Sequence, residues 1–166
     1  SHLLSNKISL EDTFRVSEKA WKKGGSKMFV EIGKRVSIED LLRGMIIQSG
    51  NDASIVLAEG LFGSEELFAM EMNRYAKKIG MLNTNFKNST GWPDPDHITT
   101  ARDLSLLAIS LYNTFPKYMK YYSEKNFTYN KIKQGNRNPL LYKKLGSDGL
   151  KTGHTEKSGY GLVGSA

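Results

Sequence analysis

The chain has 166 residues, 39% of them hydrophobic, which is enough for one packed domain or most of one. Its formal charge of +7 comes from dispersed lysines and arginines, without the clustered basic stripe of a nucleic-acid-binding protein, so no nucleic-acid partner is expected. The absence of cysteine excludes disulfides and thiolate metal sites, and no apolar stretch is long enough to span a bilayer. Any membrane association would therefore depend on segments absent from this sequence.

The N-terminal third is predicted to contain two strands followed by a helix. Residues 13–16 and 28–32 have strand-like composition and are separated by a glycine-containing loop at 23–25. Ser37 is suited to cap a helix, and Asp40 stands at the position of a capping-box carboxylate. The residues expected on the buried face of this helix are Leu41, Leu42, Met45 and Ile46.

The middle of the chain is predicted to be mainly helical. A second helix includes residues 53–58, and a third spans about 64–80, ending at a glycine that suits a left-handed C-cap. Residues 88–97 contain two prolines and are expected to form a loop. A fourth helix begins at Thr100 and ends before Pro116.

The pattern changes near residue 127. Residues 127–132 alternate as an exposed strand does, 134–136 are expected to form a turn, and two further strands are expected around Lys151 and Tyr160. We therefore predict an α+β fold, with a mainly helical part at about 37–126 and strands of an antiparallel sheet in 127–166. Because the last strand stops in mid-pattern, the domain is expected to be incomplete at both ends.

Two short motifs carry the candidate chemistry. Lys151, Thr152 and Gly153 provide a cation, a hydroxyl donor for a carboxylate and a strand edge without a side chain, which together suit a peptide that ends in a carboxylate. Ser49-Gly50-Asn51 lies between two predicted helices, where its side chains can point into a cleft. Taken alone, the first motif is also compatible with an ordinary strand start, and the second with an ordinary helix break.

Together these motifs resemble those of the penicillin-binding serine D-alanyl-D-alanine carboxypeptidases. Residues 46–53 are similar to the second motif of that family, 88–103 to its loop-and-helix segment, and 149–160 to its third motif. The resemblance extends from about Ile8 to the end of the chain. It implies a β-lactamase/transpeptidase-like fold, with a helical subdomain and part of an antiparallel sheet.

The resemblance also implies a role for each site residue. Ser49, Asn51 and Lys151 are then catalytic: Ser49 relays a proton to the departing D-alanine, Asn51 orients the substrate amide, and Lys151 sets the electrostatics of the cleft. Substrate binding is assigned to Thr152, Gly153 and Arg137, with the guanidinium of Arg137 binding the terminal carboxylate. No metal or other cofactor is implied.

One element of the family pattern is missing. No serine of this sequence has lysine three residues later, so the Ser-x-x-Lys motif that contains the nucleophile is absent, and its expected place is just before Leu3. The chain alone is therefore expected to be inactive, whereas its parent is expected to remove the terminal D-alanine from peptidoglycan stem peptides in the periplasm or elsewhere outside the cytoplasm, and to bind β-lactams.

Two alternatives remain open at this point. A serine β-lactamase is disfavoured by Gly50, because class A β-lactamases usually have aspartate there. A catalytically dead peptidoglycan-binding module would keep the partial site for holding a peptide.

Overall fold

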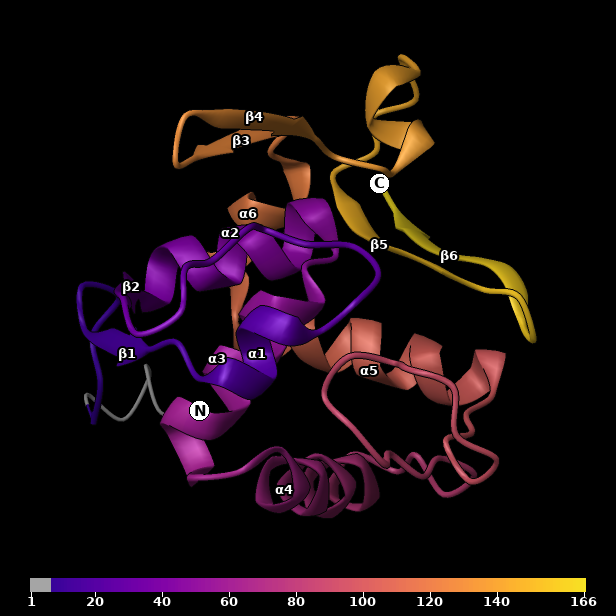
Figure 1. Ribbon diagram of the computed structural model, residues 1–166. Coiled ribbons are helices and arrows are strands. Elements are labelled where there is room, and N and C mark those ends of the chain that lie inside the picture. Colours follow the sequence, from indigo (N-terminus) through magenta and orange to yellow (C-terminus); the bar gives the residue numbers. More distant parts are fainter. Residues whose placement is uncertain (1–6) are drawn as a thin grey trace.

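A computed structural model describes residues 7–166 of the chain and shows short strands around a helical middle (Figure 1). The helices are α1 (Glu18–Lys22), α2 (Ile38–Gln48), α3 (Asn51–Phe62), α4 (Glu65–Lys78), α5 (Ala101–Thr114) and α6 (Lys120–Ser123), with 3₁₀ turns at Pro116–Tyr118 and Pro139–Tyr142. The strands are β1 (Thr13–Arg15), β2 (Arg35–Ser37), β3 (Asn126–Tyr129), β4 (Ile132–Gly135), β5 (Gly149–Thr155) and β6 (Gly159–Ser165). Each strand pairs antiparallel with its neighbour in the chain, as β1–β2, β3–β4 and β5–β6.

Side-chain caps begin three of the helices. The hydroxyl groups of Ser37, Ser64 and Thr100 each accept a hydrogen bond at 3.1 Å from the backbone N–H three residues later, which satisfies a donor that the helix itself cannot. Gly80 follows α4 with a φ of +87°, as expected for a left-handed C-cap glycine. The sequence prediction of these helices is confirmed.

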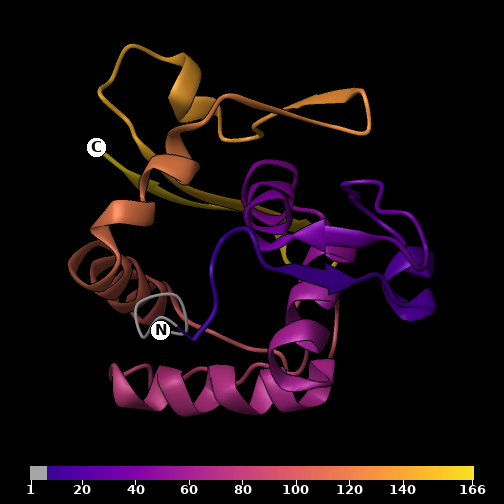
Figure 2. The same ribbon diagram turned by 90° about the vertical axis from the view of Figure 1, so that its left-hand side faces the viewer.

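The helices α2 and α3 form the centre of the molecule. The side chains of Leu41 and Ile47 on α2 and of Ile55 and Val56 on α3 are completely buried. Both views place the β3–β4 hairpin on one side of this pair and α4 on the opposite side (Figures 1 and 2). The apolar area that these residues remove from water is the main stabilising contribution to the fold.

Two strand predictions are wrong. Residues 28–32 form no strand; they are irregular, with Phe29 at a φ of 69°. The loop expected at 23–25 is present, and a short helix for which no prediction was made, α1, precedes it. Residues 127–132 are not one strand but a hairpin, which turns at Asn130 and Lys131 with positive φ values, so the turn predicted at 134–136 lies four residues too late.

The β5–β6 hairpin is held against α5 by a polar cluster. The hydroxyl of Tyr112 donates to the carboxylate of Asp148 at 2.7 Å and lies 2.8 Å from the hydroxyl of Ser165, which itself donates to Asp148. Tyr112 belongs to α5, Ser165 to β6, and Asp148 directly precedes β5. This cluster therefore connects both strands of the hairpin with the helical part.

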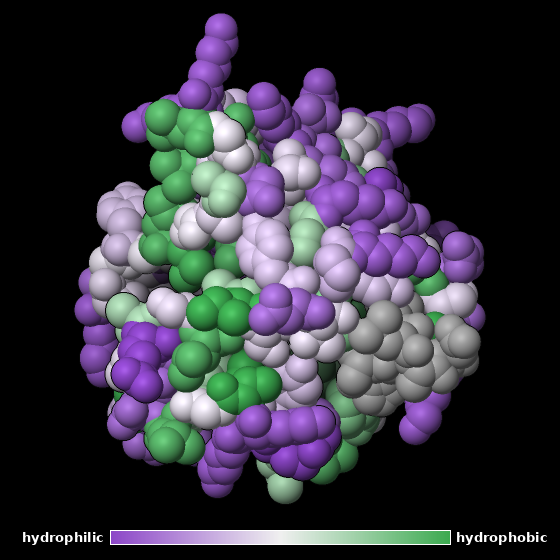
Figure 3. All heavy atoms as spheres, turned by 180° about the vertical axis from the view of Figure 1, so that it is seen from behind, coloured by the Kyte–Doolittle hydropathy of each residue, from purple (hydrophilic) through white to green (hydrophobic). Residues whose placement is uncertain are grey.

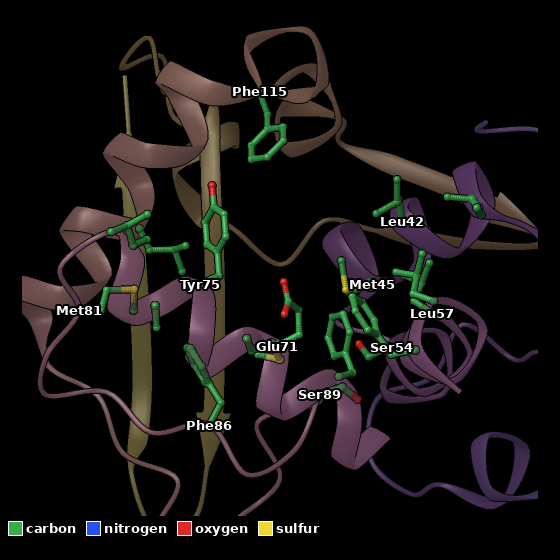
Figure 4. Close-up of a pocket in the computed structure, with 18 of the residues that line it drawn as sticks. Leu42, Met45, Ser54, Leu57, Glu71, Tyr75, Met81, Phe86, Ser89 and Phe115 are labelled. Atoms are coloured by element: carbon green, nitrogen blue, oxygen red, sulfur yellow. The ribbon is translucent and has the colours of Figure 1, made fainter. Parts of the chain in front are cut away.

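A cavity of about 360 Å³ that was not predicted lies between the helices. Its walls are mostly apolar side chains from the helices and adjoining segments, including Met45 on α2, Leu57 on α3, Tyr75 on α4 and Phe115 just after α5, and the carboxylate of Glu71 lies among them (Figure 4). Hydrophobic side chains also gather on the rear surface of the molecule (Figure 3). The cavity lining includes neither Ser49 nor Lys151, so it is distinct from the candidate site.

Every helix within residues 7–166 is too short or too polar to serve as a membrane span.

Candidate active site

The Ser49-Gly50-Asn51 motif forms the tight junction between α2 and α3. Ser49 ends α2 in the left-handed conformation, with a φ of 56°, and its backbone N–H donates to the carbonyl of Gly44. A Cβ added to Gly50 would lie 3.0 Å from the carboxylate of Asp52 and 3.1 Å from the carbonyl oxygen of Gly44. A side chain at this position would be crowded by both neighbours, which favours glycine here.

The two motifs meet although they are far apart in the sequence. The ammonium group of Lys151, on β5, donates a short hydrogen bond to the hydroxyl of Ser49 and a second, of 2.7 Å, to the carbonyl of Thr152. This hydrogen bond brings Ser49 and Lys151, 102 positions apart in the sequence, into one site. The second bond also holds the side chain of Lys151 along β5.

The surroundings of Lys151 favour loss of its proton. Burial of the ammonium group, together with the positive charge of Arg137, lowers the pKa of Lys151 to about 8. A lysine with such a pKa can donate or accept a proton near neutral pH, which an ordinary surface lysine cannot do. The Ser49–Lys151 pair is therefore suited to proton transfer.

Asn51 lies in the same junction but has no hydrogen bond to Lys151. Its side-chain amide donates to the carbonyl of Gly24 at 2.9 Å, and its backbone N–H donates to the carbonyl of Ser26 at 2.9 Å. The loop that contains Gly24 and Ser26 thus fixes the orientation of Asn51. A Cβ at Gly25, which has a φ of +77°, would lie 2.7 Å from the amide nitrogen of Asn51, so the approach requires glycine here.

The residues expected to bind the carboxylate of the substrate lie close to the Ser49–Lys151 pair. The guanidinium of Arg137 donates to the hydroxyl of Ser26 at 2.6 Å, and its charge acts on Lys151. Thr152 follows Lys151 on β5 and is partly buried, whereas Gly153 is exposed. A Cβ added to Gly153 would meet nothing within 4 Å, so there is open space beside the strand.

Asp52 is a site-supporting residue that the sequence analysis missed. Its buried carboxylate accepts hydrogen bonds from the backbone N–H groups of Met28 (2.8 Å), Phe29 (2.9 Å) and Val30 (3.2 Å). These bonds hold the irregular segment 28–30 against the start of α3, and they explain why the segment is not a strand. Two features of the sequence could have indicated this role. Asp52 comes directly after the Ser-x-Asn motif, and the apolar run at 28–32 has no strand to pair with.

The Trp92 side chain anchors its loop beside the junction. Its ring packs against the backbone of Gly24 and Gly25, and the ammonium of Lys23 lies 4.0 Å from the ring centroid. This packing attaches the loop at 88–97 to the glycine-containing loop that orients Asn51.

No group of three or more metal-ligating side chains occurs within residues 7–166. The expected place of the nucleophile, just before Leu3, lies outside the described residues.

A Ser-x-Asn junction between two helices that faces a Lys-Thr-Gly strand is the arrangement of the transpeptidase/β-lactamase-like class of active-site serine proteins. The sequence model described as D-alanyl-D-alanine carboxypeptidase matches residues 2–166. The chain belongs to this family.

Individual relatives agree with this assignment. The chain is 45% identical to the D-alanyl-D-alanine carboxypeptidase DacA of Haemophilus influenzae over 99% of its own length and 43% of that protein. It resembles the crystal structure of penicillin-binding protein 5 of Haemophilus influenzae with a TM-score of 0.94 and 43% identity, covering 98% of this chain and 48% of the other. A further match is the ampicillin-bound penicillin-binding protein D2 of Listeria monocytogenes, with a TM-score of 0.86 and 30% identity over 99% of this chain and 68% of the other.

The chain spans less than half the length of the curated carboxypeptidase that it matches.

Proposed function

We propose that the chain is the central part of a serine-type D-Ala-D-Ala carboxypeptidase. The whole enzyme removes the terminal D-alanine from peptidoglycan stem peptides through an acyl-enzyme intermediate. The observation that supports this function best is the hydrogen bond from Lys151 to Ser49, because it joins the two family motifs in one site. Membership of the carboxypeptidase family supports the same reaction.

The nucleophile is supplied by a Ser-x-x-Lys segment outside these 166 residues, because no serine here has lysine three positions later. Its hydroxyl oxygen attacks the carbonyl between the two D-alanines and loses its proton to the paired lysine. Collapse of the tetrahedral intermediate breaks the peptide bond, and the leaving nitrogen takes up a proton as free D-alanine departs. Water then hydrolyses the ester and releases the shortened peptide.

Ser49 and Lys151 deliver the proton to the leaving nitrogen. The hydroxyl of Ser49 already accepts a hydrogen bond from Lys151, so it can pass on one proton while it receives another. The lowered pKa of Lys151, about 8, makes this donation easier than it would be for an ordinary lysine. Asn51, held by Gly24 and Ser26, orients the amide of the substrate.

Thr152 and Arg137 bind the terminal carboxylate of the substrate, and Gly153 leaves room for the peptide to lie along β5. β-Lactams contain a carboxylate beside a reactive carbonyl and occupy the same site. The whole protein acts in the cell envelope outside the cytoplasm, where stem peptides occur. Any contact with the membrane comes from segments outside this chain.

A fluorescent penicillin tests this function directly. The longer protein that contains the chain is expected to be labelled covalently, with the label on the serine of its Ser-x-x-Lys motif. The isolated chain is expected to remain unlabelled, because none of its serines has an activating lysine in the paired position.

Mass spectrometry of the labelled peptide gives the decisive outcome. A label on any serine of the isolated chain contradicts our account of the nucleophile. A longer protein that has the motif but neither reacts with penicillin nor cleaves D-Ala-D-Ala peptides would instead be a peptidoglycan-binding module.

A further inference from the structure

The side chain of Gln48 connects the chain segment that contains Ser49 with the segment that contains Arg137. Gln48 is the last residue of α2 and is 3% exposed, so it is not presented to a ligand. Its amide nitrogen donates to the carbonyl oxygen of Gly135 at 2.9 Å. The next residue after Gln48 is Ser49, and Arg137 follows two residues after Gly135.

The hydrogen bond from Gln48 to Gly135 therefore links two parts of the chain. One lies next to Ser49, the candidate proton-relay residue, and the other lies next to Arg137, the candidate carboxylate-binding residue. A second glutamine reinforces the connection, because the amide of Gln134 donates to the carbonyl of Lys27 at 3.1 Å. Lys27 is adjacent to Ser26, whose hydroxyl accepts from Arg137 and whose carbonyl accepts from the backbone of Asn51.

Residues 136–138, which include Arg137, have other hydrogen-bonded supports that come from a different direction. The backbone N–H of Asn136 donates to the carbonyl of Lys125 at 2.8 Å, and the side-chain amide of Asn138 donates to the carbonyl of Gly149 at 2.9 Å. These bonds connect residues 136–138 with the segment before β3 and with the start of β5. The bond from Gln48 to Gly135 connects the adjoining end of β4 directly with the helix preceding Ser49.

We propose that Gln48 is a positioning residue that sets the distance between Arg137 and the Ser49–Lys151 pair. It thereby matches the site to substrates that end in a free carboxylate on a D-alanine. This proposal rests on the proposed function, because it assumes that Arg137 binds the terminal carboxylate. Gln48 itself touches neither the substrate nor the reacting atoms.

The test uses the whole enzyme and a pair of D-Ala-D-Ala peptides, one with a free C-terminal carboxylate and one amidated. Gln48→Met keeps the size of the side chain but removes the donor to Gly135. It is expected to lower kcat/KM on the free-acid peptide about five-fold, mainly through KM, and to leave the amidated peptide nearly unchanged. The ratio of the two kcat/KM values is therefore the readout.

A double-mutant cycle with Arg137→Ala identifies the route of the effect. If Gln48 acts through Arg137, Gln48→Met adds no further loss once the guanidinium is gone. Independent losses that multiply in the double variant would overturn the proposal. So would equal losses on the two peptides from Gln48→Met, since a general loosening of the fold does not depend on the terminal carboxylate.

Asn73 provides a matched control. Its side-chain amide donates to the carbonyl of Phe86 at 2.7 Å and so also connects a helix with a distant backbone segment, away from the site. Asn73→Leu is expected to lower the melting temperature without changing the ratio between the peptides. If Gln48→Met does not fold, Gln134→Met takes its place, because it removes the neighbouring hydrogen bond to Lys27. It is expected to lower the ratio between the peptides less strongly than Gln48→Met would. An unchanged ratio in Gln134→Met overturns the proposal.

Failure of this inference is distinguishable from failure of the proposed function. Arg137→Ala alone is expected to lower activity on the free-acid peptide selectively. Equal losses on both peptides in that variant contradict the role of Arg137 itself. A selective Arg137→Ala effect without coupling to Gln48 contradicts the positioning role of Gln48 alone.

Discussion

Lys151 is the residue whose chemistry depends most strongly on its surroundings. Its pKa of about 8 in the folded chain lies below the ordinary value of 10.5, because the ammonium group is buried and lies near the positive charge of Arg137. Between these two pH values the unfolded chain binds more protons at this residue than the folded chain does. The contribution of Lys151 to the free energy of unfolding therefore rises with pH across that window and is least favourable below pH 8.

We predict that removing the charge of Arg137 raises the pKa of Lys151. In Arg137→Gln one of the two causes is lost while burial remains, so the pKa should rise but stay below 10.5. An NMR titration of the lysine Cε signals in the isolated chain measures it. Arg74→Gln serves as the control, because Arg74 pairs with Glu71 on α4 and should not influence Lys151. A Lys151 that titrates like the exposed lysines in the unchanged chain would contradict this account.

Arg137 and Thr152 are the residues that we propose bind the terminal carboxylate in the whole enzyme. Replacing Arg137 or Thr152 by alanine should reduce kcat/KM on a free-acid D-Ala-D-Ala peptide on the order of ten- to a hundred-fold, because a charge-assisted hydrogen bond is lost. Arg137→Lys should recover part of this loss, since a point charge cannot reproduce the planar guanidinium. Steady-state kinetics on free-acid and amidated peptides measures the effect. Losses of the same size on both peptides would assign a structural role to these residues.

At the scale of elements, the segment before β2 owes its shape to a single carboxylate. Asp52 accepts hydrogen bonds from the backbone of Met28, Phe29 and Val30, and also caps its own helix through Ala53. Ser26, whose hydroxyl accepts from Arg137, lies just before these residues. The geometry of the site therefore depends on a residue that is completely buried behind it.

Asp52→Asn is expected to destabilise the isolated chain by about 3 kcal/mol, because an amide group cannot accept all of these hydrogen bonds and buried donors are left unsatisfied. Chemical denaturation measures the free energy of unfolding. Asp12→Asn is the control, since Asp12 is exposed and accepts one bond, of 2.8 Å, from the backbone of Ser9; it should change stability by less than about 0.5 kcal/mol. Equal stability of Asp52→Asn and the unchanged chain would show that the carboxylate is not needed.

The sequence predicts the helices better than the irregular segments, for a physical reason. Caps such as Ser64 and Thr100 act on backbone groups three residues away, so their effect is visible in a short window of sequence. Residues 28–32 have the composition of a strand, but their conformation is decided by Asp52, more than twenty residues later. The turn at Asn130 contains no glycine, so the hairpin was predicted as one strand.

The same distinction applies to the candidate site. The pairing of Ser49 with Lys151 was predicted from the family motifs and not from local pattern. The contact between Ser26 and Arg137 joins residues 111 positions apart, and nothing in a single sequence indicates it. The bond from Gln48 to Gly135 was missed for the same reason. The division into a helical part at 37–126 and a strand part at 127–166 stays a prediction.

For the whole molecule, the site exists only while the β5–β6 hairpin stays docked on the helical part. Lys151 belongs to β5 and Ser49 to the end of α2, so any movement of the hairpin separates them. The hydrogen bond from Tyr112 to Asp148, together with the bond from Ser165 to the same carboxylate, fixes the end of the hairpin opposite its turn. The stability of this docking should therefore be measurable separately from that of the core.

We predict that Tyr112→Phe loosens the hairpin selectively. The variant keeps the ring but loses the hydroxyl that donates to Asp148, which should lower the stability of the docked hairpin by about 1–2 kcal/mol. The hydrogen bond from Ser165 to Asp148 remains. Hydrogen exchange should become faster in β5 and β6 while the amides of α2 and α3 keep their protection, because local opening needs less free energy than global unfolding. Tyr118→Phe, on the neighbouring 3₁₀ turn, is the control and should leave both regions unchanged. Equal acceleration in the hairpin and in α3 would mean that both open as one unit, and that the docking contributes no separate step.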